Sequence, residues 1–155
     1  MTILIAYDGS ADAHAAIAYA GGHVRPEPAV VVTVWEPLLT QLTLSALATS
    51  ATAVPLPDEG EQWEEERQAT GVAREGAGLA AAAGFPEATA RAERGNGPVW
   101  AAIVDVAEEM DATLVVIGSR GLSAVKSVLL GSVSNRVLHH ARRPVLVVPP
   151  GPGDG

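Results

Sequence analysis

Short aliphatic runs alternate with helix-like segments along the chain. Runs with few polar interruptions, such as Ala29 to Trp35 and Ala112 to Ile117, are typical of parallel strands buried on both faces. Thr2 to Tyr7 and Pro144 to Val148 have the same character, whereas Ala88 to Arg94 alternates small apolar and polar residues as a half-exposed edge strand does. The pattern therefore predicts five strands.

Four segments with helical periodicity separate these strands. Ser10 is suited to cap the first helix, and Gly21-Gly22 is expected to end it. The second helix is predicted over Glu61 to Ala83, where a less polar stripe should cover one face of the sheet. Pro98 is expected at the first position of the third helix, and Ser132 to Ala141 forms the fourth.

This strand and helix order predicts an α/β fold of the Rossmann-like type. Right-handed crossovers require a five-stranded parallel sheet with helices on both faces, and we expect the order 3-2-1-4-5. Residues 1–149 are expected to form one domain and residues 150–155 a flexible tail. The stretch 36–60 is too long for an ordinary connection, so it is a lid, a partner surface or a disordered loop. Ligands of such sheets bind where the winding reverses, here after the first and fourth strands.

Composition and charge argue against two classes of partner, nucleic acids and membranes. The formal net charge is −8, whereas binding to a nucleic-acid backbone requires clustered Lys and Arg, so we expect no nucleic-acid partner. The longest apolar strand has about seven residues, against the roughly 20 of a membrane-spanning helix, so no membrane partner is expected. The absence of cysteine agrees with a cytoplasmic location.

The strongest chemical signal lies between the fourth strand and the last helix. Gly118, two residues, Gly121, nine residues, Gly131 and Ser132 follow one another there. Glycines permit close backbone approach and positive φ, so that successive N–H groups can face an anion, and the helix start at Ser132 adds further donors. Neither a P-loop lysine nor a dinucleotide-binding glycine pattern after the first strand is present. The sequence therefore predicts a phosphate site built without lysine.

Four segments resemble the universal stress protein family in order, over nearly the whole chain. They are Ala6-Tyr7-Asp8-Gly9-Ser10, Gly118-Ser119-Arg120-Gly121, Leu130-Gly131-Ser132-Val133-Ser134 and Arg143-Pro144-Val145-Leu146-Val147-Val148. The glycine spacing is similar to that of the ATP-binding branch of the family, so the resemblance implies ATP as the cofactor, together with Mg²⁺.

The resemblance also implies a role for particular residues. Ala6, Tyr7 and Asp8 would line the base and ribose region, with Asp8 on the ribose, and the backbone of Val34 would meet adenine. The expected ribose and phosphate contacts are Ile117, Gly118, Gly121, Gly131, Ser132, Val133 and Ser134. Arg120 is expected either to approach phosphate or to face solvent, while His14 and the other histidines are expected at the surface or at helix ends.

No activated nucleophile or paired-carboxylate site can be nominated beside these residues. We therefore expect a nucleotide-responsive regulatory switch with slow or negligible hydrolysis, at most a weak ATPase. The alternatives are a weak nucleotide hydrolase and a nucleotide-free interaction module that binds an unidentified protein partner.

The strand from Pro144 to Val148 is expected at an edge of the sheet. An unpaired apolar edge is an aggregation hazard, which pairing with the same strand of a second copy would remove. The resemblance implies the same arrangement, so a homodimer through Val145 and Val147 is expected.

Overall fold

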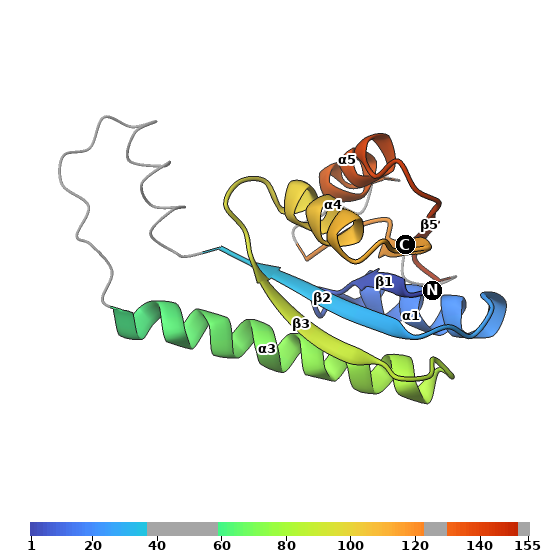
Figure 1. Ribbon diagram of the computed structural model, residues 1–155, viewed down its shortest axis with the longest axis horizontal. Helices are drawn as coiled ribbons and strands as arrows, with labels where there is room; N and C mark the ends of the chain where they lie inside the picture. Colours follow the sequence, from blue (N-terminus) through green and yellow to red (C-terminus); the bar gives the residue numbers. More distant parts are fainter. Residues whose placement is uncertain (37–58, 123–129, 152–155) are drawn as a thin grey trace.

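The computed structural model describes residues 1–36, 59–122 and 130–151, and Figure 1 shows how they are arranged. Strands and helices alternate along the chain as predicted. Their bounds are β1 Ile3–Ala6, α1 Ala11–His23, β2 Ala29–Trp35, α3 Glu59–Ala82, β3 Thr89–Arg94, α4 Val99–Glu109, β4 Leu114–Gly118, α5 Ser132–His140 and β5 Val145–Val148.

The strands form one five-stranded sheet in the order β3-β2-β1-β4-β5. Each neighbouring pair is parallel, and Ile3 of the central strand β1 is paired with Ala29 on one side and with Leu114 on the other. The predicted α/β fold and its strand order are therefore confirmed. This order places β1 and β4, where the winding reverses, next to each other.

Helices cover both faces of the sheet, with α1 and α3 on one side and α4 and α5 on the other (Figure 1). Successive residues of β1 supply the two cores in turn: Ile3 and Ile5 pack toward α1 and α3, whereas Leu4 packs toward α4 and α5. All three side chains are buried. Burying an aliphatic side chain of this size stabilises the fold by about 1.5–3 kcal/mol.

The first helix begins as predicted, because the Ser10 side chain accepts a hydrogen bond from the Ala13 N–H. Its predicted end is wrong, since α1 continues through Gly21-Gly22 to His23. Tight packing explains the first of these glycines, because a Cβ at Gly21 would lie 2.5 Å from the carbonyl oxygen of Ala83. Gly21 therefore permits close contact between α1 and the end of α3.

Two other predictions about helices have different outcomes. The predicted stripe of α3 is confirmed, because Ala69, Ala73 and Ala80 are buried. Pro98, however, is the residue before α4 and not its first residue, since its ψ of 144° is extended. Most of the stretch 36–60 and of the tail 150–155 lies outside the described residues, so the predictions made for them are not tested.

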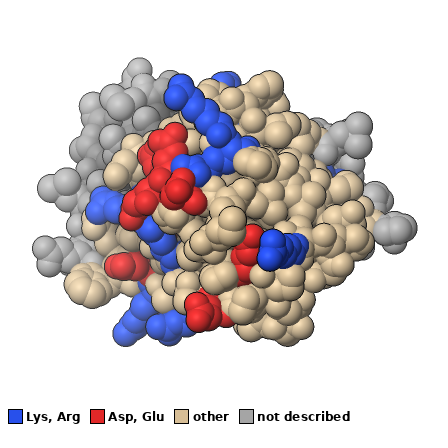
Figure 2. All heavy atoms as spheres, turned by 45° about the vertical axis from the view of Figure 1, so that its right-hand side comes forward, with Lys and Arg blue, Asp and Glu red and all other residues tan. Residues whose placement is uncertain are grey.

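No helix in the described ranges is both long enough and apolar enough to cross a membrane. At the surface, acidic and basic side chains lie next to one another on the face shown in Figure 2. Between strand β3 and helix α4, Arg91 pairs with Glu93 and Glu109 at 2.9 Å. The hydrogen bond to Arg91 lowers the pKa of the Glu109 carboxyl.

Candidate functional site

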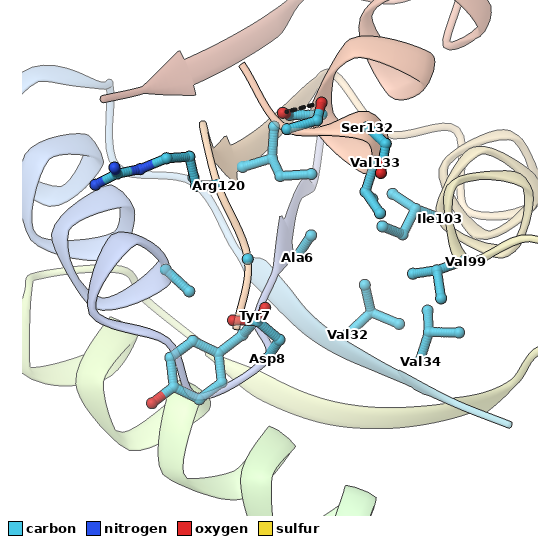
Figure 3. Close-up of a pocket in the computed structure, with 16 residues that line it drawn as sticks. Ala6, Tyr7, Asp8, Val32, Val34, Val99, Ile103, Arg120, Ser132 and Val133 are labelled. Carbon is cyan, nitrogen blue, oxygen red and sulfur yellow. Dashed lines mark hydrogen bonds between the residues drawn. The ribbon is translucent and has the colours of Figure 1, made fainter. Parts of the chain in front are cut away.

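A cavity of about 270 Å³ lies at the carboxyl ends of β1 and β4 (Figure 3). Its walls come from the ends of β1, β2 and β4, from the first turns of α1 and α4, and from the start of α5. The residues that line it are Ala6, Tyr7, Asp8, Ala13, Val32, Val34, Val99, Ile103, Ile117, Gly118, Arg120, Gly121, Gly131, Ser132, Val133 and Ser134.

The structure brings all twelve of the sequence-predicted site residues around this cavity. They come from the β1 end (Ala6 to Asp8), from Val34, from the β4 end and following turn (Ile117, Gly118, Arg120 and Gly121), and from Gly131 to Ser134. Their convergence follows from the pairing of β1 with both β2 and β4. Contact between these residues and a nucleotide remains a prediction.

One end of the cavity is apolar, and sequence reasoning identified only part of it. Val32, Val34, Val99 and Ile103 point into the same space (Figure 3). Val99 and Ile103 belong to the helix that the sequence predicts after Pro98, but helical periodicity does not reveal which residues of a helix border a cavity. These four side chains form an apolar slot at this end of the cavity.

The opposite end is formed by the start of α5. Gly131 precedes the helix and no side chain caps it. The N–H groups of the first turn, from Ser132 to Ser134, have no acceptor within the helix, and the helix dipole there favours negative charge. The Ser134 hydroxyl is already engaged, because it donates to the Ser119 carbonyl at 2.7 Å. The expected phosphate contact of Ser134 is therefore limited to its backbone N–H.

The glycines of the motif serve close packing and not the left-handed backbone that the sequence suggested. Of the described glycines, those with positive φ are Gly9 and Gly84, neither of which belongs to the motif. A Cβ at Gly118 would lie 2.9 Å from the carbonyl of Asp12, and one at Gly131 would lie 3.1 Å from the carbonyl oxygen of Ser119. The absence of side chains allows three backbone segments to meet behind the cavity.

Tyr7 faces the cavity with its backbone, while its ring turns toward α3 on the other side of the sheet (Figure 3). A Cβ at Gly76 of α3 would lie 2.7 Å from the ring, so the two are in close contact. The Tyr7 hydroxyl donates to Glu75 at 3.1 Å and lies 3.1 Å from Nε2 of His14. Burial, followed by the hydrogen bond to Glu75, raises the pKa of Tyr7 to about 12. Tyr7 therefore lines the predicted base region with its backbone and not with its ring.

His14, which is expected at the surface or at a helix end, lies in α1 and also contacts neighbouring groups. Its side chain is 41% exposed, but Nδ1 lies 2.9 Å from the Ser10 carbonyl oxygen and Nε2 lies 3.5 Å from Glu75. His14 thus links helices α1 and α3 beside the Tyr7 hydroxyl. Only the fold could reveal this, because these residues are far apart in the sequence.

Asp8 and Arg120 are both held by protein groups. One Asp8 oxygen accepts the Ser10 N–H at 2.9 Å and the other accepts the Leu122 N–H at 3.3 Å. The Arg120 Nε donates to Asp12 at 3.1 Å, and the two side chains are only 10% and 9% exposed. Arg120 therefore does not face solvent, and sequence reasoning missed Asp12 as its partner.

Thr33 is a further residue that the sequence did not single out for this site. Its buried hydroxyl donates to the Tyr7 carbonyl at 2.8 Å. This bond joins β2 to the end of β1, which places Val34 beside the apolar end of the cavity.

The residues present fit a magnesium ion held mainly by a bound phosphate. Within the described ranges, no three His, Asp or Glu side chains gather as a metal site would require. Mg²⁺ commonly takes one or two carboxylates together with substrate phosphates and water. The exposed Asp8 carboxylate and the Ser132 hydroxyl at the cavity could supply such ligands.

Comparison with known proteins adds independent information. The sequence model of the universal stress protein family matches residues 1–149. A universal stress protein of Thermus aquaticus is 35% identical over 149 residues, which are 95% of this chain and 97% of the relative. Other curated universal stress proteins match over shorter stretches, and in three of them the aligned part is 30%, 36% and 27% of the relative's length.

Solved structures share the fold. The universal stress protein from Archaeoglobus fulgidus in complex with dAMP superimposes with a TM-score of 0.64 at 21% identity, covering 96% of this chain and 97% of that one. A universal stress protein in complex with cAMP gives 0.62 at 24% identity, with coverages of 97% and 98%. Because the family match spans nearly all of the sequence, this chain belongs to the universal stress protein family.

Proposed function

We propose that the cavity binds an adenine nucleotide, with ATP and Mg²⁺ as the working ligand, and that the protein is a nucleotide-responsive regulator in the cytoplasm. The observation that carries this proposal is the polarity of the cavity. An apolar slot lies at one end and a helix N-terminus at the other, across the point where the sheet reverses its winding. A nucleotide has the same division between a flat base and a charged tail.

The apolar end suits a purine ring. Val32, Val34, Val99 and Ile103 offer aliphatic surface to a flat group. Backbone groups at the ends of β1 and β2 are the polar atoms available to a base there, which agrees with the adenine nucleotides bound by the two relatives.

The opposite end suits phosphate. The first-turn N–H groups of α5 carry the positive end of the helix dipole, and the Ser132 hydroxyl lies among them. Anions bind such helix starts without needing a lysine. The glycine turn from 118 to 121 brings further backbone close to the same space.

Slow or negligible hydrolysis is part of the proposal. The described residues lining the cavity include no His, Glu or Lys, and both oxygens of Asp8 accept backbone N–H bonds. Phosphoryl transfer to water requires a group that orients the attacking water and a positioned metal. A site built this way favours holding the nucleotide over turning it over.

We further propose that two copies pair through β5. This strand lies at one edge of the sheet, and its residues Val145 to Val147 are only partly buried. The other edge, β3, carries Arg91, Glu93 and Arg94, whose charges oppose pairing. The apolar edge is therefore the one that a second copy would cover.

Filling the apolar slot tests the proposed ligand. Val99 lies at the first position of α4 and is partly exposed, so Val99→Trp should occupy the space of the base while leaving the sheet intact. We expect calorimetric binding of Mg-ATP by the parent protein and a loss of about tenfold or more in the variant, since a wrongly filled pocket typically costs at least 1–3 kcal/mol.

Val24→Trp, at the end of α1 and outside the cavity, is the matched control and should bind Mg-ATP as the parent does. Unfolding temperatures of the nucleotide-free proteins show whether each variant folds. If the parent protein gave no binding heat and no thermal shift with millimolar Mg-ATP, the proposed function would be wrong.

A further inference from the structure

The buried ion pair between Asp12 and Arg120 joins two segments 108 residues apart in the sequence. Asp12 lies in the first turn of α1, and Arg120 belongs to the glycine turn after β4. Their side chains are 9% and 10% exposed, and the Nε to Oδ2 distance is 3.1 Å. Removing Arg120 would leave the buried Asp12 carboxylate without this partner, which is strongly unfavourable.

The direction of the arginine separates it from the expected phosphate site. Figure 3 shows the Arg120 side chain running toward α1, with its guanidinium end directed away from Ser132 and from the apolar slot. To reach a phosphate at the start of α5, the guanidinium would have to leave Asp12. That movement would leave the buried Asp12 carboxylate without its counter-charge.

The same turn also contacts the segment from Asp8 to Asp12 at both of its ends. At Gly118 the chain touches the backbone of Asp12, because a Cβ there would lie 2.9 Å from the Asp12 carbonyl. At Leu122 the N–H donates to the Asp8 carboxylate. Arg120 lies between these contacts, so its bond to Asp12 further attaches the turn to the segment from Asp8 to Asp12.

The glycine turn also fixes the position of α5. The Ser119 carbonyl accepts the Gly131 N–H at 2.6 Å and the Ser134 hydroxyl at 2.7 Å. The N–H groups of the first turn of α5 are thus placed relative to β1 and α1 through the turn. A change at Asp12 would be transmitted to these groups without any direct contact.

We propose that Asp12 and Arg120 are a positioning pair that fixes the glycine turn, and through it the phosphate-facing start of α5, without either side chain contacting phosphate. The inference rests on the proposed nucleotide site and assigns Arg120 a role different from the phosphate contact considered for it. It makes the affinity for nucleotide depend on a carboxylate that lies behind the cavity.

The direction in which Asp12→Asn changes the affinity for Mg-ATP distinguishes the two possible roles of Arg120. If Arg120 is a positioning residue, Asp12→Asn and Arg120→Gln each weaken Mg-ATP binding about tenfold, and the double variant is no weaker than the weaker single one, because all three lose the same interaction. If Arg120 were a phosphate ligand, Asp12→Asn would release a cation and remove a negative charge. Tighter binding of Mg-ATP by Asp12→Asn would therefore overturn the proposal.

Two further variants guard against a general loss of structure. Asp12→Glu keeps the charge and should retain most of the affinity, as expected if the ion pair itself matters. Asp111→Asn also breaks a carboxylate–arginine pair, with Arg143 at 2.9 Å, but at the far end of α4. It should leave nucleotide affinity unchanged.

A second measurement needs no nucleotide. Amide hydrogen exchange at Gly121 and Leu122 in the nucleotide-free protein should become about tenfold faster in both Asp12→Asn and Arg120→Gln, because the turn opens more often. It should not change in Asp111→Asn. Unchanged exchange in both pair variants would overturn the positioning role. Absence of ATP binding by the parent would instead contradict the proposed function, and the exchange rates would still decide the role of the pair.

Discussion

At the scale of single residues, side-chain direction assigns the groups around the cavity to different tasks. Tyr7 contributes backbone to the cavity and sends its hydroxyl to Glu75 and His14 behind the sheet. Ser134 uses its hydroxyl to hold the Ser119 carbonyl. Proximity to the cavity is therefore not the same as availability to a ligand.

The Tyr7 hydroxyl should make stability depend on alkaline pH. Its pKa is raised from 10.0 to about 12, chiefly by burial and then by Glu75. The protonated form thus stabilises the folded state; the contribution is complete below pH 10 and is lost as the pH rises through about 12. A shift of two pKa units corresponds to an upper limit of about 3 kcal/mol, and the loss should be smaller than this because Glu75 is 56% exposed and its charge is screened by water.

Urea unfolding at several pH values between 9 and about 12 measures this dependence. The difference in unfolding free energy between the parent and Tyr7→Phe should shrink with rising pH. Tyr19→Phe, at a side chain 47% exposed, is the matched control. A constant difference between the parent and Tyr7→Phe across this range would contradict the prediction.

At the scale of elements, glycines decide how closely helices and strands approach. Gly21 lets α1 meet the end of α3, Gly76 accepts the Tyr7 ring, and Gly118 lets β4 end against the start of α1. Gly78 has open space where a side chain would go, although it lies in the same helix as Gly76. The sequence alone does not distinguish such positions.

Alanine substitutions at two glycines should therefore change stability in opposite directions. Gly118→Ala forces a Cβ to within 2.9 Å of the Asp12 backbone and should destabilise the fold by about 1–3 kcal/mol. Gly78→Ala adds a methyl group to open space on a helix and should stabilise it by about 0.5–1 kcal/mol. Thermal and urea unfolding check both signs. A neutral Gly118→Ala would show that the turn can move away from α1.

At the scale of the whole molecule, the two edges of the sheet have different chemistry. The β3 edge carries charged residues, three of them among the six of the strand, whereas β5 consists of Val145, Leu146, Val147 and Val148. The molecule also has a net charge of −8, which disfavours non-specific association. A specific contact between copies is thus expected at β5. We propose that residues 1–149 of each copy act as one domain of this dimer.

A proline on the open side of β5 tests the dimer. The carbonyl of Pro144 accepts the Val115 N–H of β4, and that of Val148 accepts the N–H of Ser119, directly after β4. The alternation of the strand therefore directs the N–H and C=O of Val147 to the open edge. Val147→Pro should abolish pairing between copies while keeping the bonds to β4. Val147→Pro tests the pairing more specifically than a charged residue at this position would. A charged side chain at Val147 would also disturb the core between the sheet and helices α4 and α5, against which Val147 packs.

Analytical ultracentrifugation at high micromolar concentration gives the outcome. We expect a dimer for the parent protein and a monomer for Val147→Pro, with similar circular dichroism. Leu146→Pro, which removes an N–H that faces β4, should instead lower the unfolding temperature. A monomeric parent protein would disprove the proposed assembly.

Features that depend on neighbours along the chain could be predicted from the sequence. Aliphatic runs, the Ser10 cap and the order of elements predicted the sheet and its strand order, and the position of the glycine motif predicted which loops meet. Twelve of the residues around the cavity followed from this topology and from the family resemblance. Such features are accessible because hydrophobic periodicity, capping and crossover handedness are local or general rules.

Features that depend on contacts between distant segments are visible only in the folded chain. The Asp12–Arg120 pair, the turn of the Tyr7 ring toward Glu75, and the part of α4 that borders the cavity are of this kind. So is the extension of α1 through Gly21, where packing against Ala83 outweighs the low helix propensity of glycine. Local sequence patterns predict the conformation of each segment. The partner of a buried charge, and the need for glycine at a close contact, depend on how segments from opposite ends of the chain pack together.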